Sequence, residues 1–490
     1  MAAVKMNVLH WHLSDDQGFR VESKVFPKLH QLGSDGKYYL QSEVREIVAY
    51  ARDRGIRIVP EFDMPGHSTA WLVGYPELAA APGPYKIERQ WGVFEPCMDP
   101  SKEEIYEFLD SFIEEMAGLF PDEYLHIGGD EVMPTQWNSS ERIRNFKKRH
   151  NLSSNHDLHV YFNQRVLEIL AKHGKKMIGW DEILHQDLPK NIIVQSWRQN
   201  SLSRTVSRGY NAILSRGYYL DHMLPASFHY SVDPLSDAEL SDSGKILIQG
   251  GEACMWGEFV NSENIESRIW PRAAAVGERL WSPASVNDVS DLYRRLEIID
   301  RELADLGLRH QTLYLEKMQR LAGNMDARPL LTFADLIKPP VLTIRKEART
   351  YDSHTPLNRL VDAIMPESKA AREFSDLVDK LLSDSSNAGF ATEKIRESLQ
   401  FWIDNDTVLQ PILEHSYLLK EIRPLADTAS DLCKCGLEAL NYLESNQAPP
   451  KAWQEYTAVL LEDAEKPHAE IYIAILEPIR KLVERSKTMP

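Results

Sequence analysis

Residues 124–131 read YLHIGGDE, an apolar run followed by two glycines and two adjacent carboxylates. The apolar part predicts a short strand, and the glycines allow close backbone approach or unusual dihedral angles where this strand meets its loop. Asp130 and Glu131 would then lie side by side at the strand end. In a cleft poor in water, ionising both is unfavourable, so one carboxyl would keep its proton and serve as a general acid. A solvated turn explains this stretch alone equally well.

The same pattern of an apolar run followed by polar and aromatic residues recurs over the first 282 residues. The predicted strands are 8–13, 56–62, 124–128, 176–180, 192–197, 211–215 and 246–250. Helical patterns fall between most of them, at 41–54, 101–118, 157–173 and 266–280. This alternation is typical of βα units around a parallel sheet. The nearly continuous hydrophobicity of 56–62 indicates a strand buried on both faces.

Two α/β architectures fit this alternation. A doubly wound sheet usually has a glycine-rich phosphate loop after its first strand, and no such loop is present here. Barrel enzymes instead place polar side chains after many of their strands. We therefore predict a (β/α)8 TIM-type barrel over residues 1–315. Only seven strands are found and residue 1 falls within a helix, so we expect the first strand and most of the first helix to be missing. Strands 8–13 and 246–250 would then have free edges.

The character of the sequence changes after residue 315. Prolines at 329, 339 and 340 predict an irregular stretch over 328–350, within a connector that covers residues 316–356. Residues 357–490 predict an all-α C-terminal domain. Its amphipathic segments are 367–383, 391–404, 411–421, 425–445 and 466–485. No polar constellation in this region suggests chemistry.

The composition of the chain restricts the kinds of molecule that it is expected to bind. The net charge of −17 argues against nucleic acid and anionic membrane surfaces. No apolar run is long enough to span a membrane, and residues 1–13 do not form a signal peptide. The four cysteines give neither a disulfide framework nor a complete zinc site. We expect no cofactor, and the sequence leaves a homo-oligomer open.

Two features admit more than one interpretation. His10 and His12 project from the same side of a strand and, with His67, could form the zinc site of a barrel hydrolase. Histidines that hydrogen-bond neighbouring loops are commoner, and Asp15 or Asp16 could orient His67. Tryptophans 180, 197 and 256 stand at three different strand ends. Each could be a core ring, but together they could also surround a sugar.

Six motifs, in this order, resemble those of the family 20 glycoside hydrolases, the β-N-acetylhexosaminidases. They are HWHLSDDQGFR (10–20), EFDMPGH (61–67), HIGGDE (126–131), GWDE (179–182), YYLD (218–221) and GGEACMWGE (250–258). The resemblance covers about residues 1–315. Any one motif would be weak evidence, whereas six in the family order are not expected by chance.

The resemblance implies exo-acting, retaining hydrolysis of terminal non-reducing GlcNAc or GalNAc, in which the substrate's 2-acetamido carbonyl is the nucleophile. Glu131 would be the general acid/base. Asp130 would accept the acetamido N–H and stabilise the developing positive charge, and Tyr219 would hydrogen-bond the acetamido oxygen. The expected substrate-binding residues are Asp15 and His67 behind the acid, Trp180, Trp197 and Trp256 around the acetamido group, Asp221 and Glu258 on sugar hydroxyls, and His126. A buried, hydrogen-bonded histidine is the alternative for His126.

The sequence departs from the family pattern at its start. Family members carry a small α/β domain and then a first strand ending in an arginine that binds the terminal sugar, and neither is found here. A carbohydrate-binding remnant that cannot turn over is therefore the second hypothesis. The resemblance implies an extracellular, periplasmic or lysosomal location, with any export signal upstream of residue 1.

Overall fold

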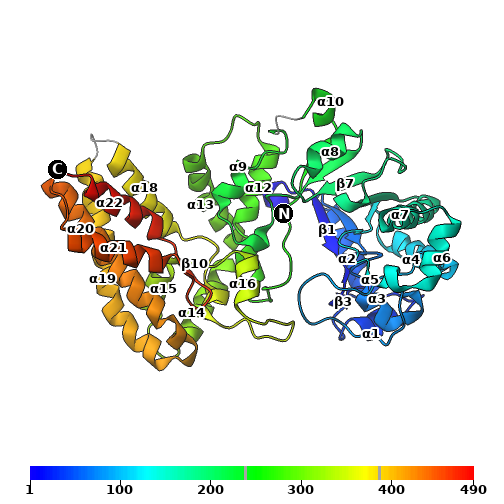
Figure 1. Cartoon of the computed structure of the whole chain (residues 1–490), viewed down its shortest axis with the longest axis horizontal. Helices are drawn as coiled ribbons and strands as arrows, with labels where there is room; N and C mark the ends of the chain where they lie inside the picture. The colour runs from blue at the N-terminus through cyan, green and yellow to red at the C-terminus, as the bar shows by residue number, and fades with distance from the viewer. Residues whose placement is uncertain (237–239, 384–387) are drawn as a thin grey trace.

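The computed structural model describes residues 1–236, 240–383 and 388–490. Two regions follow one another along the chain in Figure 1: a sheet surrounded by helices, and a group of long helices that ends at the C-terminus. The N-terminus lies between them, in the middle of the molecule (Figure 1).

A parallel sheet of seven strands is the scaffold of the first region. Its strands, in their order across the sheet, are β1 Val8–His12, β4 Arg57–Glu61, β5 Tyr124–His126, β6 Lys176–Trp180, β7 Ile193–Ser196, β8 Asn211–Leu214 and β9 Ile248–Gly251. Every neighbouring pair is parallel. All seven predicted strands are confirmed, to within two residues at each end.

β1 and β9 are the edge strands of this sheet, as expected for a barrel without its first strand. The sheet nevertheless curls enough to bring the two edges together near the strand ends. His10 Nδ1 in β1 lies 2.9 Å from Oε1 of Glu252, which directly follows β9. The rings of His12 and Trp256 are 5.2 Å apart. The fold is thus an incomplete (β/α) barrel whose two ends meet around the strand termini.

Alternate residues of the strands enter two different hydrophobic clusters. Val59, Ile178 and Ile193 pack together with side chains from other strands only. Their neighbours Ile58 and Met177 join the larger cluster beneath the helices. Because successive side chains point to opposite faces of a strand, both faces of the sheet are buried, which explains the nearly continuous hydrophobicity of residues 56–62.

Helices and short turns surround the sheet. The helices are α1 Lys28–Gly33, α2 Gln41–Arg52, α3 Thr69–Gly74, α4 Glu103–Leu119, α5 Thr135–Ser139, α6 Glu141–Arg149, α7 Asn155–Lys172, α8 Ser201–Ser207, α9 Ala226–Ser231, α10 Asp242–Lys245, α11 Ile265–Ile269, α12 Arg272–Trp281 and α13 Val289–Asp305. The helices predicted at 41–54, 101–118 and 157–173 are confirmed as α2, α4 and α7. The one predicted at 266–280 is divided into α11 and α12, because Pro271 has no N–H to continue the hydrogen-bond series.

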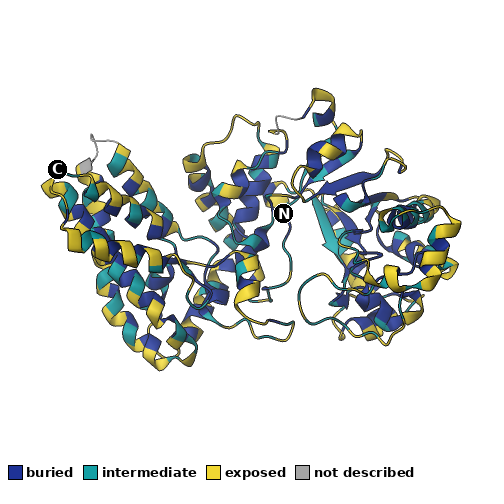
Figure 2. Cartoon of the chain, in the orientation of Figure 1, coloured by how far each residue is buried: buried dark blue, intermediate teal, exposed yellow. Residues whose placement is uncertain are grey.

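The C-terminal region is mainly helical. It contains α14 His310–Ala322, α15 Arg328–Ala334, α16 Leu342–Ala348, α17 Leu360–Ala363, α18 Lys369–Ser383, α19 Ala388–His415, α20 Arg423–Ser445, α21 Lys451–Ala464, α22 Leu476–Lys487 and a small antiparallel pair, β10 Ile337–Lys338 with β11 Tyr472–Ile473. Buried and exposed residues alternate along these helices in Figure 2. One cluster of buried apolar side chains extends from Met318 to Val483. None of the described helices is long and apolar enough to cross a membrane.

Three expectations for this region are wrong in detail. Residues 328–350 are not irregular: Pro329 lies in the first turn of α15, where a missing N–H leaves no intrahelical bond unmade. Segments 391–404 and 411–421 were expected as separate helices, but α19 continues through Pro411 as far as His415. Of segment 466–485, only the part from Leu476 onward is helical.

Candidate active site

The turn after β5 has the backbone that its sequence requires. Gly128 and Glu131 have φ angles of 68° and 47°. A Cβ atom at Gly128 would lie 1.8 Å from Oδ1 of Asp63, so only glycine fits there. The left-handed conformation of Glu131 is strained by about 1–3 kcal/mol, a cost that is found mainly at functional sites. This turn presents Asp130 and Glu131 at the end of the strand.

His67 lies between Glu131 and a second carboxylate. Its Nε2 is 3.4 Å from Oε2 of Glu131 and 3.7 Å from Oδ2 of Asp130. Its Nδ1 is 3.0 Å from Oδ1 of Asp15. Burial alone would lower the pKa of His67, but Asp15 and Asp130 raise it well above its usual value. A positively charged imidazolium therefore faces Glu131, as expected for a relay behind a proton donor.

Asp130 and Asp63 form a buried carboxyl pair. Burial raises the pKa of Asp130 to about 6, and a hydrogen bond to Asp63 moderates this rise. Burial and the neighbouring Asp130 raise the pKa of Asp63 well above its usual value. Asp63 Oδ1 also accepts a hydrogen bond of 3.1 Å from the Gly129 amide. The stronger rise at Asp63 favours a proton on this member of the pair. Sequence reasoning assigned Asp63 no role, although it lies in EFDMPGH at the end of β4.

Glu61 joins four strand ends in a buried cluster. Its carboxylate lies 2.6 Å from His12 Nδ1 and 3.0 Å from His10 Nε2 of β1, 3.1 Å from His126 Nδ1 of β5 and 2.9 Å from Trp180 Nε1 of β6. Burial alone would raise the pKa of Glu61, but the neighbouring histidines hold it well below its usual value. Burial would lower the pKa of His10, and Glu252 and Glu61 raise it to about 10. The sequence did not predict this cluster, because its members are far apart along the chain.

His126 is buried at the end of β5. It is 1% exposed, and its Nδ1 accepts a 3.0 Å hydrogen bond from the Gly128 amide. Burial lowers the pKa of His126, which fits this acceptor role. This geometry favours the alternative of a buried histidine, and a substrate contact of His126 stays a prediction.

The zinc hypothesis required His10, His12 and His67 to converge. Among the described residues, the sets of three side chains with potential ligand atoms within 4.8 Å of one another are His10–Glu61–His126, Asp15–Asp16–His67 and Asp63–His67–Asp130. None of these sets combines the three histidines. Instead, His10 and His12 contact Glu61, and His67 contacts Asp15.

Aromatic rings form one wall beside Asp130. The ring centroids of Trp180 and Trp256 are 5.9 Å apart, and those of Tyr219 and Trp256 are 6.3 Å apart. Burial raises the pKa of Tyr219, so its hydroxyl stays protonated. Trp197 lies elsewhere in the site: its Nε1 donates a 3.2 Å hydrogen bond to Glu182, and its ring lines an adjoining cleft. A common box of Trp180, Trp197 and Trp256 around the acetamido group stays a prediction.

Asp221 and Glu258 supply acceptors near Trp256. Among the described residues, Asp221 Oδ1 and Glu258 Oε2 are buried oxygen atoms with no hydrogen-bond partner. Burial raises the pKa of Asp221 to about 6 and that of Glu258 to about 7. Unpaired buried acceptors are costly, so these oxygens are suited to receive hydroxyl groups of a ligand.

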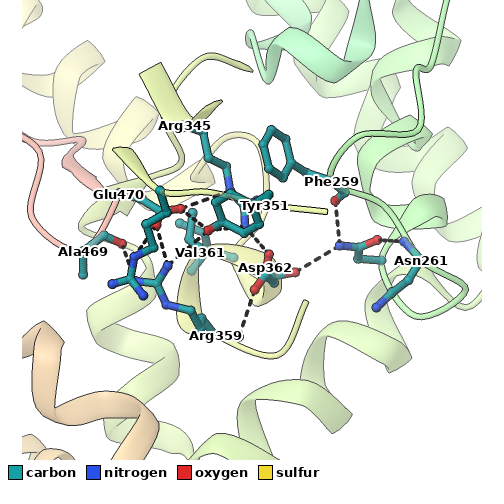
Figure 3. A network of polar contacts seen from close by, with 12 residues as sticks. Phe259, Asn261, Arg345, Tyr351, Arg359, Val361, Asp362, Ala469 and Glu470 are labelled. Atoms are coloured by element: carbon teal, nitrogen blue, oxygen red, sulfur yellow. Dashed lines mark hydrogen bonds and ion pairs between the residues drawn. The ribbon is translucent and has the colours of Figure 1, made fainter. Parts of the chain in front are cut away.

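A buried network of charges in the C-terminal region lies next to Phe259 (Figure 3). Arg345 pairs with Asp362, and its Nε lies 3.2 Å from Oε2 of Glu470. Arg359 contacts the same glutamate at 2.5 Å, and Tyr351 donates a hydrogen bond to it. Arg345, Asp362 and Glu470 are each at most 5% exposed. Since a buried charge needs its partners, this network has a well-defined geometry.

The network holds the segment that follows residues 256–258. The Arg345 guanidinium lies 4.3 Å from the centroid of the Phe259 ring, and the Tyr351 ring is 4.9 Å from the same ring. Asn264 donates a 3.2 Å hydrogen bond to the Phe259 carbonyl. The C-terminal region therefore fixes the loop that carries Trp256 and Glu258.

Replacing Arg345 by Met is expected to loosen this loop, because breaking a buried ion pair costs about 3–5 kcal/mol. Amide hydrogen exchange should become faster in residues 256–264 and stay unchanged in β5. The matched control is Arg328→Met, since Arg328 pairs with Asp326 while 86% exposed. Unchanged exchange in residues 256–264 of the Arg345→Met variant would show that the network does not hold the loop.

A cleft of about 770 Å³ adjoins the aromatic wall. Glu131, Glu182 and Trp197 line it.

The chain is similar to known proteins over most of its length. The model of the glycosyl hydrolase family 20 catalytic domain matches residues 1–284. The β-hexosaminidase subunit beta of Mus musculus is 39% identical over 326 residues, which cover 64% of this chain and 60% of that protein. The β-hexosaminidase of Porphyromonas gingivalis is 33% identical over 379 residues, covering 72% of this chain and 48% of that protein. The chain thus spans 60% or less of the length of these two relatives.

Solved structures of two enzymes are also similar to this chain. The chitobiase of Flavobacterium johnsoniae superimposes with a TM-score of 0.92 and 38% identity, covering 98% of this chain and 74% of that one. A family 20 exo-β-N-acetylglucosaminidase of Vibrio harveyi gives a TM-score of 0.58 and 28% identity, covering 63% of this chain and 54% of that one.

Proposed function

The chain belongs to glycosyl hydrolase family 20, and from this premise we propose that it is an exo-acting β-N-acetylhexosaminidase that removes terminal non-reducing GlcNAc or GalNAc. The observation that carries the proposal is the adjacent pair Asp130 and Glu131 at the end of β5, with Glu131 3.4 Å from a charged His67. The similarity to proteins named β-hexosaminidase and chitobiase supports the reaction class.

Glu131 is the proton donor of this mechanism. It protonates the glycosidic oxygen as the bond to the leaving group breaks, and it later takes a proton from the attacking water. His67, whose charge is maintained by Asp15, stabilises the Glu131 carboxylate that is formed by the first transfer. The 37% exposure of the Glu131 side chain supports its access to both substrate and water.

The substrate supplies the nucleophile. The carbonyl oxygen of its 2-acetamido group attacks the anomeric carbon and closes an oxazolinium ring, which water then opens with net retention. Asp130 accepts the acetamido N–H and balances the positive charge of the ring, while Tyr219 donates a hydrogen bond to the acetamido oxygen. Trp180 and Trp256 enclose the methyl group. Asp63, by donating to Asp130, fixes the direction in which Asp130 accepts.

Hydrolysis of a chromogenic β-GlcNAc tests this function. We expect turnover, and we expect inhibition by a thiazoline that mimics the oxazolinium ion. Saturable binding of GlcNAc with no release of the chromophore would favour a carbohydrate-binding protein instead.

The pKa of about 6 at Asp130 predicts an acidic limb in the pH profile of kcat/KM. Asp130 must be ionised to stabilise the positive ring, so activity should fall as the pH decreases through this value. Glu182, Asp221 and Glu258 titrate in the same range, so the limb alone does not identify Asp130.

Two variants of Asp63 test whether the acidic limb reports the ionisation of Asp130. Asp63→Asn keeps a hydrogen-bond donor to Asp130 and should leave the limb in place. Asp63→Leu removes the donor, destabilises ionised Asp130 and should move the limb to higher pH. A limb that is the same in both variants would contradict the role of Asp63.

A further inference from the structure

His12 connects the two carboxylates that lie on either side of it. Its Nε2 is 2.9 Å from Oδ2 of Asp15, and its Nδ1 is 2.6 Å from Oε2 of Glu61. The sheet register brings it to Glu61, because the two residues are opposite one another in the parallel pair β1 and β4. Asp15 also contacts His67, which lies beside Glu131. His12 thus joins the buried cluster around Glu61 to the residues behind the proposed proton donor.

Both ring nitrogens of His12 carry a proton. An ionised carboxylate accepts hydrogen bonds and donates none, so each nitrogen has to be the donor. Burial alone would lower the pKa of His12, but Glu61 and Asp15 raise it well above its usual value. A cation between two anions needs both of them, since a buried charge is costly without its partners. The direction of the His12 ring is therefore fixed at both ends.

The direction of the Asp15 carboxylate depends on His12. This side chain is 26% exposed, so hydrogen bonds rather than close packing determine how it is turned. Oδ1 accepts from the Asp16 amide at 2.6 Å and from His67 Nδ1 at 3.0 Å, and Oδ2 accepts from His12. Without the donor on Oδ2, the carboxylate is free to rotate and to turn Oδ1 away from His67.

The position of His67 depends in turn on Asp15. Its φ angle is 45°, a left-handed conformation that is unfavourable for residues other than glycine and is found mainly at functional sites. Its Nε2 lies 3.4 Å from Oε2 of Glu131, longer than a good hydrogen bond. A small change in the direction of this ring therefore decides how well it stabilises the Glu131 carboxylate.

The other end of this series of contacts is anchored in the barrel. Glu61 is completely buried, accepts a 2.9 Å hydrogen bond from Trp180 Nε1 and lies 3.0 Å from His10 Nε2. Nδ1 of His10 is 2.9 Å from Oε1 of Glu252, next to β9. Polar groups that satisfy one another make a buried network rigid. The cluster therefore gives His12 a fixed support.

We propose that His12 is a positioning residue for the proton donor Glu131. Supported by Glu61, it fixes Asp15, and Asp15 keeps His67 in place. The inference rests on the proposed function, in which Glu131 protonates the leaving group, and His12 does not itself transfer that proton. The competing explanation is that His12 only neutralises the buried charge of Glu61, and it predicts no particular effect on proton donation.

His12→Gln tests this role with two substrates that differ in their leaving group. Glutamine has one side-chain nitrogen, which cannot reach both carboxylates. We expect kcat/KM for GlcNAc-β1,4-GlcNAc to fall by about 10- to 100-fold, because misplacing a catalytic group by about 1 Å costs up to about 10²-fold. The loss should be much smaller for dinitrophenyl β-GlcNAc, which needs no proton from the donor. The His12 ring also lies 5.2 Å from that of Trp256, but losing this contact affects both substrates equally.

The matched control is His310→Gln. His310 is buried and its Nε2 lies 2.6 Å from Oδ1 of Asp300, but it belongs to α14, outside the site. The ratio of the two kcat/KM values should stay unchanged there. Adding His12→Gln to Glu131→Gln should also leave the ratio unchanged, because the proton donor is already lost. An equal loss for both substrates in His12→Gln, or a further fall of the ratio in the double variant, would overturn the inference.

A buried charge on Glu61 without its partner destabilises His12→Gln. If this variant does not fold, His12→Gln/Glu61→Gln replaces it, because removing both charges of a buried pair costs less than removing one. The ratio should fall by the same factor. In this variant too, an unchanged ratio contradicts the inference.

Failure of the proposed function is distinguishable from failure of this inference. If the unmodified chain cleaves neither substrate, the function fails, and the position of His67 is then followed by NMR of protein that carries isotope-labelled histidine. Its signals are those lost in His67→Gln. They should shift in His12→Gln and stay unchanged in His310→Gln. Signals that do not move in His12→Gln refute a link between His12 and His67.

Discussion

Glu131→Gln is expected to lower kcat for β-GlcNAc disaccharides by about 10²–10⁴-fold, the usual contribution of a general acid. Glutamine preserves the shape of the side chain but has no proton to donate to the glycosidic oxygen. The loss should be much smaller for a dinitrophenyl β-GlcNAc, because this leaving group departs without protonation. The dependence on the leaving group separates a lost proton donor from general damage to the site.

The matched control is Glu123→Gln. Glu123 lies just before β5, at the opposite end from Glu131, and its carboxylate is 54% exposed and pairs with Lys176. Surface pairs of this kind contribute little, so activity should stay unchanged. Full activity of Glu131→Gln on a disaccharide would show that Glu131 is not the proton donor.

Asp130→Asn is expected to reduce kcat/KM by about 10²–10³-fold, the range seen when one group that stabilises developing charge is removed. The amide oxygen can still accept the acetamido N–H, but it cannot balance the positive charge of the oxazolinium ion. The same reasoning predicts that the cationic thiazoline inhibitor binds much more weakly to Asp130→Asn.

Measuring the inhibition constant in both variants separates the two carboxylates. The thiazoline should keep most of its affinity for Glu131→Gln, because its binding requires no proton transfer from Glu131. If Asp130→Asn bound the thiazoline as tightly as the unmodified chain does, Asp130 would have no role in stabilising charge.

The sequence predicted what local patterns determine. Each strand of the sheet is a short apolar run buried on both faces, so its position could be recognised without knowing its neighbours. Gly128 and Gly129 marked the turn, because a turn that passes so close to Asp63 has no space for a side chain. The prediction of adjacent carboxylates at a strand end followed from the same eight residues.

Contacts between distant segments could not be predicted in this way. Glu61 is one carboxylate in a strand, and only the curl of the sheet brings it within reach of histidines from β1 and of Trp180 from β6. Arg345 is 86 positions from Phe259, so its contact with the loop depends on how the C-terminal region packs.

The C-terminal helices show a local rule overridden by packing. The sequence predicted two segments here, 391–404 and 411–421, and the second begins at Pro411, whose ring prevents one backbone hydrogen bond. In the structure α19 continues past it, and Leu409, Ile412 and Leu413 are all buried in the large apolar cluster. Burial of these side chains outweighs the missing hydrogen bond.

The central claim is that the substrate's own acetamido carbonyl is the nucleophile. It is tested most directly by comparing kcat/KM for 4-methylumbelliferyl β-GlcNAc with analogues in which the acetyl methyl carries one, two or three fluorine atoms. Fluorine withdraws electrons from the carbonyl oxygen and weakens it as a nucleophile. The mechanism predicts that kcat/KM falls with each added fluorine. A rate that does not change across the series would contradict it.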